Sequence, residues 1–168
     1  MIIMGLDLSL SSTGWNLITE DNLVLGCDRI CTSPKNNTEY ERMQIVANEI
    51  KELIEINSVD VVVAEDQFFA RNPKTGLTLS RLMGAIVYVC MELDVQFELL
   101  TPTQARKILT GDGKLNKEQI ANYIRENYYD CGEFSDKGKD KTSDKYDSLA
   151  ISLAWNKLDK INKKYNKK

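Results

Sequence analysis

The 168-residue sequence contains no histidine. Without histidine the chain cannot use a Ser-His-Asp or Cys-His nucleophile, nor a histidine proton shuttle. Zinc sites of the Cys₂His₂ or Cys₃His type are excluded for the same reason, and the four cysteines lack the spacing of a disulfide scaffold or a zinc site, so we expect them to be reduced thiols. If the chain is an enzyme, its chemistry must come from carboxylates, lysines, hydroxyls or a bound metal ion.

Long hydrophobic runs are also missing. The longest one, residues 85–91, is far shorter than the roughly 18 apolar residues of a membrane span. Residues 1–5 carry neither the basic segment nor the cleavage site of a secretory signal. These absences predict a cytoplasmic protein with no membrane partner. The length, with 42% apolar residues, predicts a single domain over residues 1–168.

Charge is unevenly distributed, although the net charge is only −3. Residues 39–66 hold eight acidic and two basic side chains, whereas residues 101–125 hold five basic and two acidic ones. The last twelve residues contain six lysines and one aspartate. This segregation predicts acidic metal ligands on one side and a phosphate-binding flank on the other. For the basic C-terminal tail, from about residue 160, simple solvation of the surface is the alternative.

The spacing of apolar residues predicts an α/β domain. Runs at 1–8, 15–18 and 23–30 indicate three antiparallel strands, and runs at 59–64 and 95–100 indicate two more that pair in parallel. Helical spacing predicts helices from Thr38, where Glu41 completes a capping box, and over 76–93, 101–109 and 116–127. A polar loop at 130–143 leads to a last helix from about Asp144. A meander followed by parallel crossovers is typical of a ribonuclease-H-like mixed sheet with helices on both faces.

The predicted helix 76–93 is apolar around most of its circumference. A helix that packs only on its own sheet needs one apolar face, so this one requires a second partner surface. We expect that surface to be another copy of the chain, with Leu82 and Ile86 at the interface.

Four carboxylates stand at the ends of predicted elements. Asp7 and Glu65 each follow a buried strand, and Asp144 and Asp147 open the last helix one turn apart. Sites in α/β sheets form at the carboxyl ends of strands, and converging carboxylates repel one another unless a cation neutralises them. Oxygen ligands without histidine or thiolate favour Mg²⁺ or Mn²⁺. As an alternative, Asp144 is only an N-cap and Asp147 only a favourable first-turn anion.

Four segments in this order and spacing resemble the RuvC-type Holliday-junction resolvases. They are residues 4–9 with 13–15 (MGLDLS, TGW), 64–72 (AEDQFFARN), 111–113 with Lys117 (GDG) and 144–151 (DKYDSLAI), and together they span residues 1 to about 157. The resemblance implies a homodimeric endodeoxyribonuclease that cleaves four-way and other branched DNA junctions. It also implies two Mg²⁺ ions per site, for which Mn²⁺ would substitute. No branch-migration partner is indicated.

The resemblance also assigns roles. Asp7, Glu65, Asp144 and Asp147 match the catalytic metal ligands, and Lys117 matches a basic position that serves both catalysis and DNA binding. The expected DNA-binding residues are Phe68, Arg71, Arg106, Lys107, Lys114 and Lys117. Lys107 and Lys114 are added to this set from the charge distribution. Arg106 replaces a usual lysine, and a guanidinium cannot act as a neutral amine. The short chain, rich in Lys and Asn, is similar to a divergent phage or mobile-element member. That resemblance implies a bacterial or phage-infected host cytoplasm.

Three alternatives stay open at this point. The first is a non-catalytic junction-binding protein, and the second is a related nuclease for other branched or RNA–DNA hybrid substrates. The third is a fragment of an actin-like or sugar-kinase-like ATPase, whose phosphate hairpin resembles residues 7–13. The ATPases need two such domains, and 168 residues supply one. Metal-dependent cleavage of a four-way junction discriminates among these functions.

Overall fold

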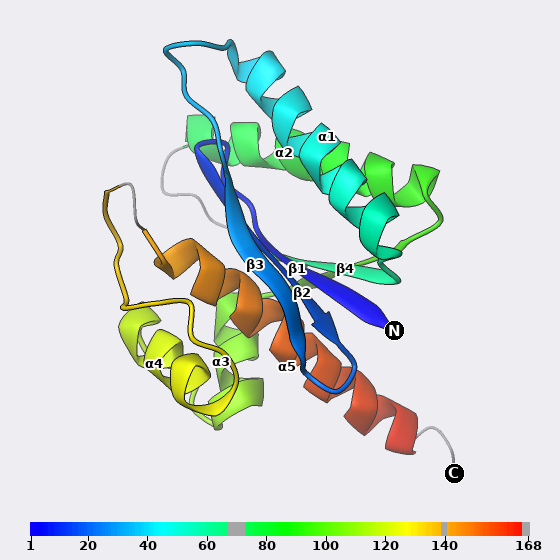
Figure 1. The fold of residues 1–168 in the computed structure, drawn as a ribbon, viewed down its shortest axis with the longest axis vertical. Coiled ribbons are helices and arrows are strands. Elements are labelled where there is room, and N and C mark those ends of the chain that lie inside the picture. The colour runs from blue at the N-terminus through cyan, green and yellow to red at the C-terminus, as the bar shows by residue number, and fades with distance from the viewer. Residues whose placement is uncertain (67–72, 139–140, 166–168) are drawn as a thin grey trace.

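A five-stranded mixed sheet forms the centre of the molecule. The computed structural model describes residues 1–66, 73–138 and 141–165. The sheet order is β3-β2-β1-β4-β5, with β2 antiparallel to both β1 and β3, and β4 parallel to both β1 and β5 (Figure 1). The strands are β1 (Ile2–Asp7), β2 (Ser12–Thr19), β3 (Val24–Cys31), β4 (Val61–Glu65) and β5 (Gln96–Leu100). The predicted meander and parallel crossovers are confirmed.

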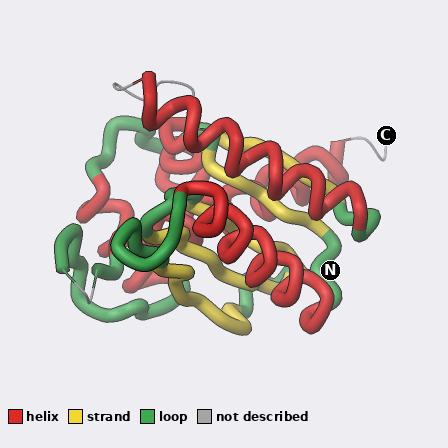
Figure 2. Tube along the Cα trace, turned by 90° about the horizontal axis from the view of Figure 1, so that it is seen from above, coloured by secondary structure: helices red, strands yellow, loops and turns green. Residues whose placement is uncertain are grey.

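Helices cover both faces of the sheet. They are α1 (Glu39–Asn57), α2 (Pro73–Glu92), α3 (Pro102–Thr110), α4 (Lys117–Asn127) and α5 (Ser143–Tyr165). In Figure 1, α1 and α2 lie on one side of the sheet and α3, α4 and α5 on the other. Figure 2, seen from above, shows the strands beneath α1 and α2. Among the described residues, none of these helices is both long and apolar enough to cross a bilayer.

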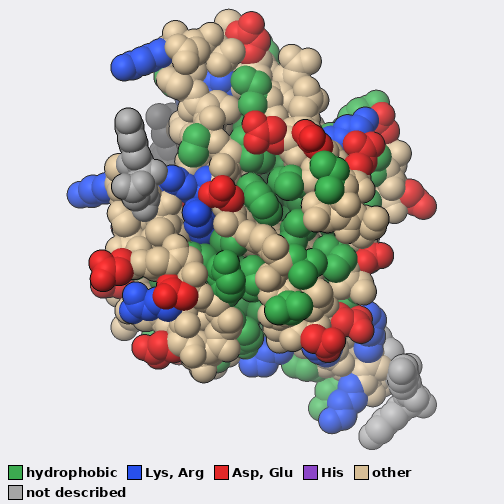
Figure 3. All heavy atoms as spheres, in the orientation of Figure 1, with side chains coloured by type: hydrophobic (Ala, Val, Ile, Leu, Met, Phe, Trp, Pro, Cys, Tyr) green, Lys and Arg blue, Asp and Glu red, His purple; other side chains and the backbone are tan. Residues whose placement is uncertain are grey.

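Local signals set most helix starts. Thr38, Thr101 and Asn116 each accept a hydrogen bond from the backbone N–H three residues on, and each forms a complete capping box. The predicted starts of α1, α3 and α4 are therefore confirmed. Helix α2 begins at Pro73, three residues before the expected position, and proline is well suited to the first turn because it needs no N–H partner there. Residues 160–165 of the predicted basic tail continue α5, and Figure 3 shows basic side chains beside that end of the helix.

Strand parity directs the site residues toward α5. Met4 packs in the core beneath α1 and α2, whereas Ile3 packs in the core formed with α3, α4 and α5. Because side chains alternate along a strand, Asp7 faces the α5 side with Ile3. Val63 also lies in the α5-side core, so Glu65, two residues on, faces the same layer. The two strands are parallel neighbours, which places both carboxylates at one end of the sheet.

The interface prediction for Leu82 and Ile86 is wrong. Both side chains are fully buried in the protein's own core, where α2 packs with α1 against the sheet. Helical periodicity identifies an apolar face but not its partner, and this face meets its own chain. The exposed apolar residues of α2 are Leu77, Tyr88 and Met91, with Met91 76% exposed.

Helix α5 lies directly on β1 and β2. A Cβ atom added at Gly14 would overlap the backbone carbonyl of Asp144, and one added at Gly5 would overlap the carbonyl of Ser148. The Ser152 hydroxyl donates a 2.7 Å hydrogen bond to Asn16 Oδ1 across the same contact. The absence of side chains at these two strand positions lets the first turns of α5 approach the carboxyl end of β1.

Candidate active site

Four carboxylates from three elements converge at the carboxyl end of the sheet. Asp7 ends β1, Glu65 ends β4, and Asp144 and Asp147 lie in the first turns of α5. Asp7, Asp144 and Asp147 are buried, with no more than 8% of each exposed, and Glu65 is half-buried. The structure thus brings together the four acids predicted from the sequence.

The charges of neighbouring acids affect the pKa values of the carboxylates in this cluster. Burial raises the pKa of Asp7 well above its usual value, and repulsion from Glu65, Asp147 and Asp144 adds to this rise. Burial and the charge of Asp147 raise the pKa of Glu65 to about 7. Burial also raises the pKa of Asp147, although the neighbouring Lys117 opposes the rise. A cluster with these raised pKa values is short of positive charge.

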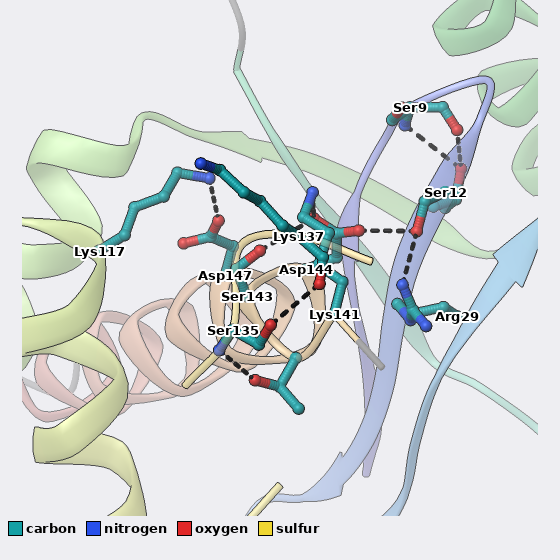
Figure 4. Close-up of polar contacts among 12 residues, drawn as sticks. Ser9, Ser12, Arg29, Lys117, Ser135, Lys137, Lys141, Ser143, Asp144 and Asp147 are labelled. Carbon is teal, nitrogen blue, oxygen red and sulfur yellow. Dashed lines mark hydrogen bonds and ion pairs between the residues drawn. The ribbon is translucent and has the colours of Figure 1, made fainter. Parts of the chain in front are cut away.

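Two lysines supply part of that charge. Lys117, at the start of α4, donates to the Asp147 carboxylate, and Lys141 Nζ lies 2.5 Å from Asp144 Oδ1 (Figure 4). Burial on its own would lower the pKa of Lys117, but Asp147, Asp7 and Glu65 outweigh that effect and raise it. Lys117 is therefore a cation at the site. The sequence reasoning missed Lys141, for which the spacing of three residues to Asp144 was the available signal.

Asp144 is held from the sheet as well as from its own helix. The Ser12 hydroxyl on β2 donates a 2.7 Å hydrogen bond to Asp144 Oδ2, and Arg29 on β3 donates to the Ser12 oxygen at 3.5 Å (Figure 4). Asp144 lies inside the first turn of α5 and its carboxylate faces β2. The alternative in which Asp144 serves only as an N-cap is wrong.

Arg42 on α1 fixes the turn that follows Asp7. Its side chain is buried, and its guanidinium donates to the Leu10 carbonyl at 3.2 Å, to Ser11 Oγ at 3.0 Å and to Thr32 Oγ1 at 2.8 Å. A guanidinium with donors on three sides can hold an irregular turn in one conformation. Neither Ser12 nor Arg42 was predicted as a site residue, because no local pattern connects them to the carboxylates.

The predicted DNA-binding residues lie in different places. Arg106 on α3 is close enough to lower the pKa values of Glu65 and Asp147, which places its charge at the site. Lys107 and Lys114 are exposed on α3 and on the loop after it. Phe68 and Arg71 lie outside the described residues. The predicted polar loop before α5 has no helix or strand over its described part, 130–138 and 141–142.

Sequence comparison identifies the family. The model of the family described as crossover junction endodeoxyribonuclease RuvC matches residues 3–154. This chain belongs to the RuvC family. It is 24% identical over 157 residues to the RuvC of Dictyoglomus thermophilum, covering 92% of this chain and 96% of that protein. It is 31% identical over 130 residues to the RuvC of a Nitratiruptor species, covering 74% and 80% of the two chains.

Solved structures show the RuvC fold. Thermus thermophilus RuvC superposes with a TM-score of 0.81 at 21% identity, covering 96% of this chain and 97% of that one. The yeast mitochondrial Holliday junction resolvase superposes with a TM-score of 0.69 at 17% identity, covering 97% and 80%. These structures confirm the ribonuclease-H-like fold, and the family match over residues 3–154 confirms the assignment to the crossover junction endodeoxyribonucleases. The ATPase-fragment alternative is wrong.

The RuvC site opens to solvent through a cleft of about 480 Å³. Its lining includes Asp7, Asp144, Lys117, Lys141 and Arg42. A neighbouring cavity of about 250 Å³ borders Glu65 and shares Leu8 with the first. Together, the cleft and the cavity reach the ends of β1 and β4 and the start of α5.

The donor set fits a hard divalent cation. Four carboxylates, no histidine and no thiolate at the site are the ligand chemistry of Mg²⁺ and Mn²⁺. With the side chains as they stand, no three acidic or cysteine residues of the described part are placed around one common point. The ammonium groups of Lys117 and Lys141 lie against Asp147 and Asp144 instead. A bound cation would compete with these lysines for the same oxygens.

Proposed function

We propose that this RuvC-family chain cleaves four-way DNA junctions, and other branched junctions, by Mg²⁺-dependent phosphodiester hydrolysis. The observation that carries the proposal is the convergence of Asp7, Glu65, Asp144 and Asp147 at one end of the sheet beside Lys117. Burial, together with the charges of neighbouring acids, raises the pKa of Asp7, Glu65 and Asp147, so divalent cations bound among these groups would stabilise their charged forms. Thermus thermophilus RuvC has been solved in complex with a Holliday junction substrate, which supports the same substrate class here.

The four carboxylates are the proposed ligands of two divalent cations, and the charges of the other three acids all act on Asp7 and help to raise its pKa. When bound, the cations supply an activated water and neutralise the leaving oxygen. The chain's own cations act on the phosphate. Lys117 is held protonated, and Arg106 is always charged, so both stabilise negative charge on the phosphoryl oxygens.

DNA arms are proposed to follow the α3–α4 layer away from the cleft. Lys107 and Lys114 are exposed there, so they are suited to contact phosphates. Phe68 and Arg71, which follow Glu65 in the sequence, complete the proposed DNA-binding set. Selectivity for a branched substrate is then read mainly from DNA shape, since phosphate contacts carry no base sequence.

We also propose that the chain forms a two-fold symmetric homodimer. A four-way junction offers two equivalent strands for cleavage, and a symmetric dimer matches that arrangement. The exposed apolar residues Leu77, Tyr88 and Met91 give α2 an outer face that a second copy can cover.

The test is cleavage of a synthetic four-way junction compared with linear duplex, a flap and an RNA–DNA hybrid, each with Mg²⁺, with Mn²⁺ and with EDTA. The proposal expects cleavage of the junction above the other substrates, only with a divalent cation, and none by Asp7→Asn. Asp21→Asn, at an exposed position in the β2–β3 turn, is the matched control and should cleave normally. Junction binding without cleavage under every condition would favour a non-catalytic binder, and preferential cleavage of the hybrid would favour the related nuclease.

A further inference from the structure

Two cysteines far apart in the sequence meet in the fold. The sulfur atoms of Cys27 on β3 and Cys131 in the loop before α5 lie 3.5 Å apart, although 104 positions separate them in the chain. Both residues are half-buried, whereas Cys31 is exposed and Cys90 is buried elsewhere. The pair is therefore distinct in its geometry from the other two cysteines, and the active-site assignment does not use it.

The pair lies over the first turn of α5. The backbone N–H of Cys131 donates to the Tyr146 hydroxyl at 3.1 Å, and that hydroxyl donates to the Gly132 carbonyl at 2.7 Å. On the other side, the Cys27 sulfur lies 3.9 Å from the Lys145 carbonyl oxygen. Lys145 and Tyr146 stand between the two acidic residues of this turn, so the two sulfurs connect the sheet edge, the loop and the helix start.

The surroundings make the two thiols chemically unequal. The hydrogen bond from Cys27, with help from the Lys145 charge, lowers the pKa of Cys131. The same bond, burial and the Cys131 charge raise the pKa of Cys27. A thiolate is the nucleophile in disulfide exchange, so Cys131 is the attacking sulfur and Cys27 the resolving one.

We propose that Cys27 and Cys131 form a redox-active dithiol that a small-molecule disulfide, such as oxidised glutathione, converts to an intramolecular disulfide. Cys131 attacks one sulfur of glutathione disulfide, forming a protein–glutathione mixed disulfide and releasing one glutathione thiolate. Cys27 loses its proton to solvent and attacks the Cys131 sulfur, forming the Cys27–Cys131 bond and releasing the second glutathione thiolate. The two protein thiols are oxidised and one glutathione disulfide is reduced to two thiols.

Geometry permits this closure. A disulfide bond is about 2.05 Å long, so the sulfurs must approach by about 1.5 Å. Cys131 belongs to a segment without helix or strand, which can shift by that amount more easily than β3 can. The bond would link the segment before α5 to the edge of the sheet. It would join the two cysteines that lie farthest apart in the sequence, and a disulfide that closes a long stretch of chain stabilises more than one that closes a short stretch.

The experiment uses the purified full chain, incubated with excess oxidised glutathione, unfolded, and alkylated before mass spectrometry. We expect two of the four thiols to escape alkylation, a mass lower by two hydrogens, and a peptide pair joined through Cys27 and Cys131. Dithiothreitol should restore all four thiols. Cys31→Ser is the matched control and should form the same bond, whereas Cys27→Ser should keep glutathione on Cys131 because its resolving thiol is gone.

Thermal unfolding supplies a second readout that does not depend on nuclease activity. We expect the oxidised chain to melt about 5–15 °C above the reduced chain, and Cys131→Ser to show no such difference. Four alkylated thiols after oxidation of a chain whose circular dichroism is native would overturn the proposal. A bond that includes Cys31 or Cys90, or glutathione held on Cys31 alone, would overturn it as well.

Discussion

Replacement of Glu65 by glutamine should make the metal-free protein more stable at neutral pH. The glutamate has a native pKa raised from 4.5 to about 7, because burial and Asp147 disfavour its charged form. The native state therefore holds a proton that the unfolded chain releases above pH 4.5. The stability that Glu65 contributes is fully present below about pH 4.5 and is lost as the pH rises through about 7. The amide of the variant cannot ionise, so the variant keeps the stability that the wild type loses as the pH rises.

The size of the effect follows from the pKa change. A rise from 4.5 to about 7, at about 1.4 kcal/mol per pKa unit, corresponds to about 3 kcal/mol. The variant should gain this amount on the wild type between about pH 5 and pH 8, which amounts to about 6–12 °C in melting temperature. Loss of the Glu65 charge also relieves Asp7, whose pKa it raises, and this contribution has the same sign.

Urea unfolding in EDTA at several pH values from 5 to 8 measures the difference directly. Glu52→Gln, at an exposed position of α1, is the control and should show no comparable dependence on pH in this range. A wild-type-minus-variant difference that stays constant with pH would refute the argument that Glu65 carries a buried, repelled charge. With Mg²⁺ present the order should reverse, because the cation stabilises the charged cluster and the amide is a weaker ligand.

Three further predictions concern the proposed function. Asp7→Asn should lower the single-turnover cleavage rate by about 10³-fold or more while junction binding in a gel-shift titration stays equal or tightens, because repulsion of phosphate falls. Lys117→Ala should lower the slope of log affinity against log salt by about 0.9 and also slow cleavage at saturation by about 10²-fold; a rate that recovers fully at saturation would limit Lys117 to binding. Tyr88→Glu should convert the proposed dimer to a folded monomer in solution scattering, and a variant that is as dimeric as the wild type would move the interface off α2.

Much of the fold could be predicted because its signals are local. The capping box predicted at Thr38 lies within four residues of chain, as do those that the structure adds at Thr101 and Asn116. The alternation of apolar residues in a strand likewise lies within that strand. The carboxylates could be predicted for a related reason. Asp7 and Glu65 end neighbouring parallel strands, so the sheet brings them together once its order is known.

What supports those carboxylates could not be predicted in the same way. Ser12 reaches Asp144 across 132 positions of sequence, and Arg42 reaches the turn at Leu10 across 32. Such contacts depend on how α5 and α1 are rotated on the sheet, which periodicity does not specify. The same limit explains the error on α2, where an apolar stripe at Leu82 met the protein's own core.

Gly5 and Gly14, which have no Cβ atom, set the distance between carboxylates on different elements. Alanine at Gly14 or Gly5 would force the helix backbone of α5 off the sheet and carry Asp144 and Asp147 away from Asp7. Neither glycine is a ligand or a proton carrier. A survey of all single substitutions should nevertheless rank both glycines with the acidic residues in their effect on cleavage. When the reactive groups of an enzyme lie on separate elements, the contact between those elements sets the distance between the groups.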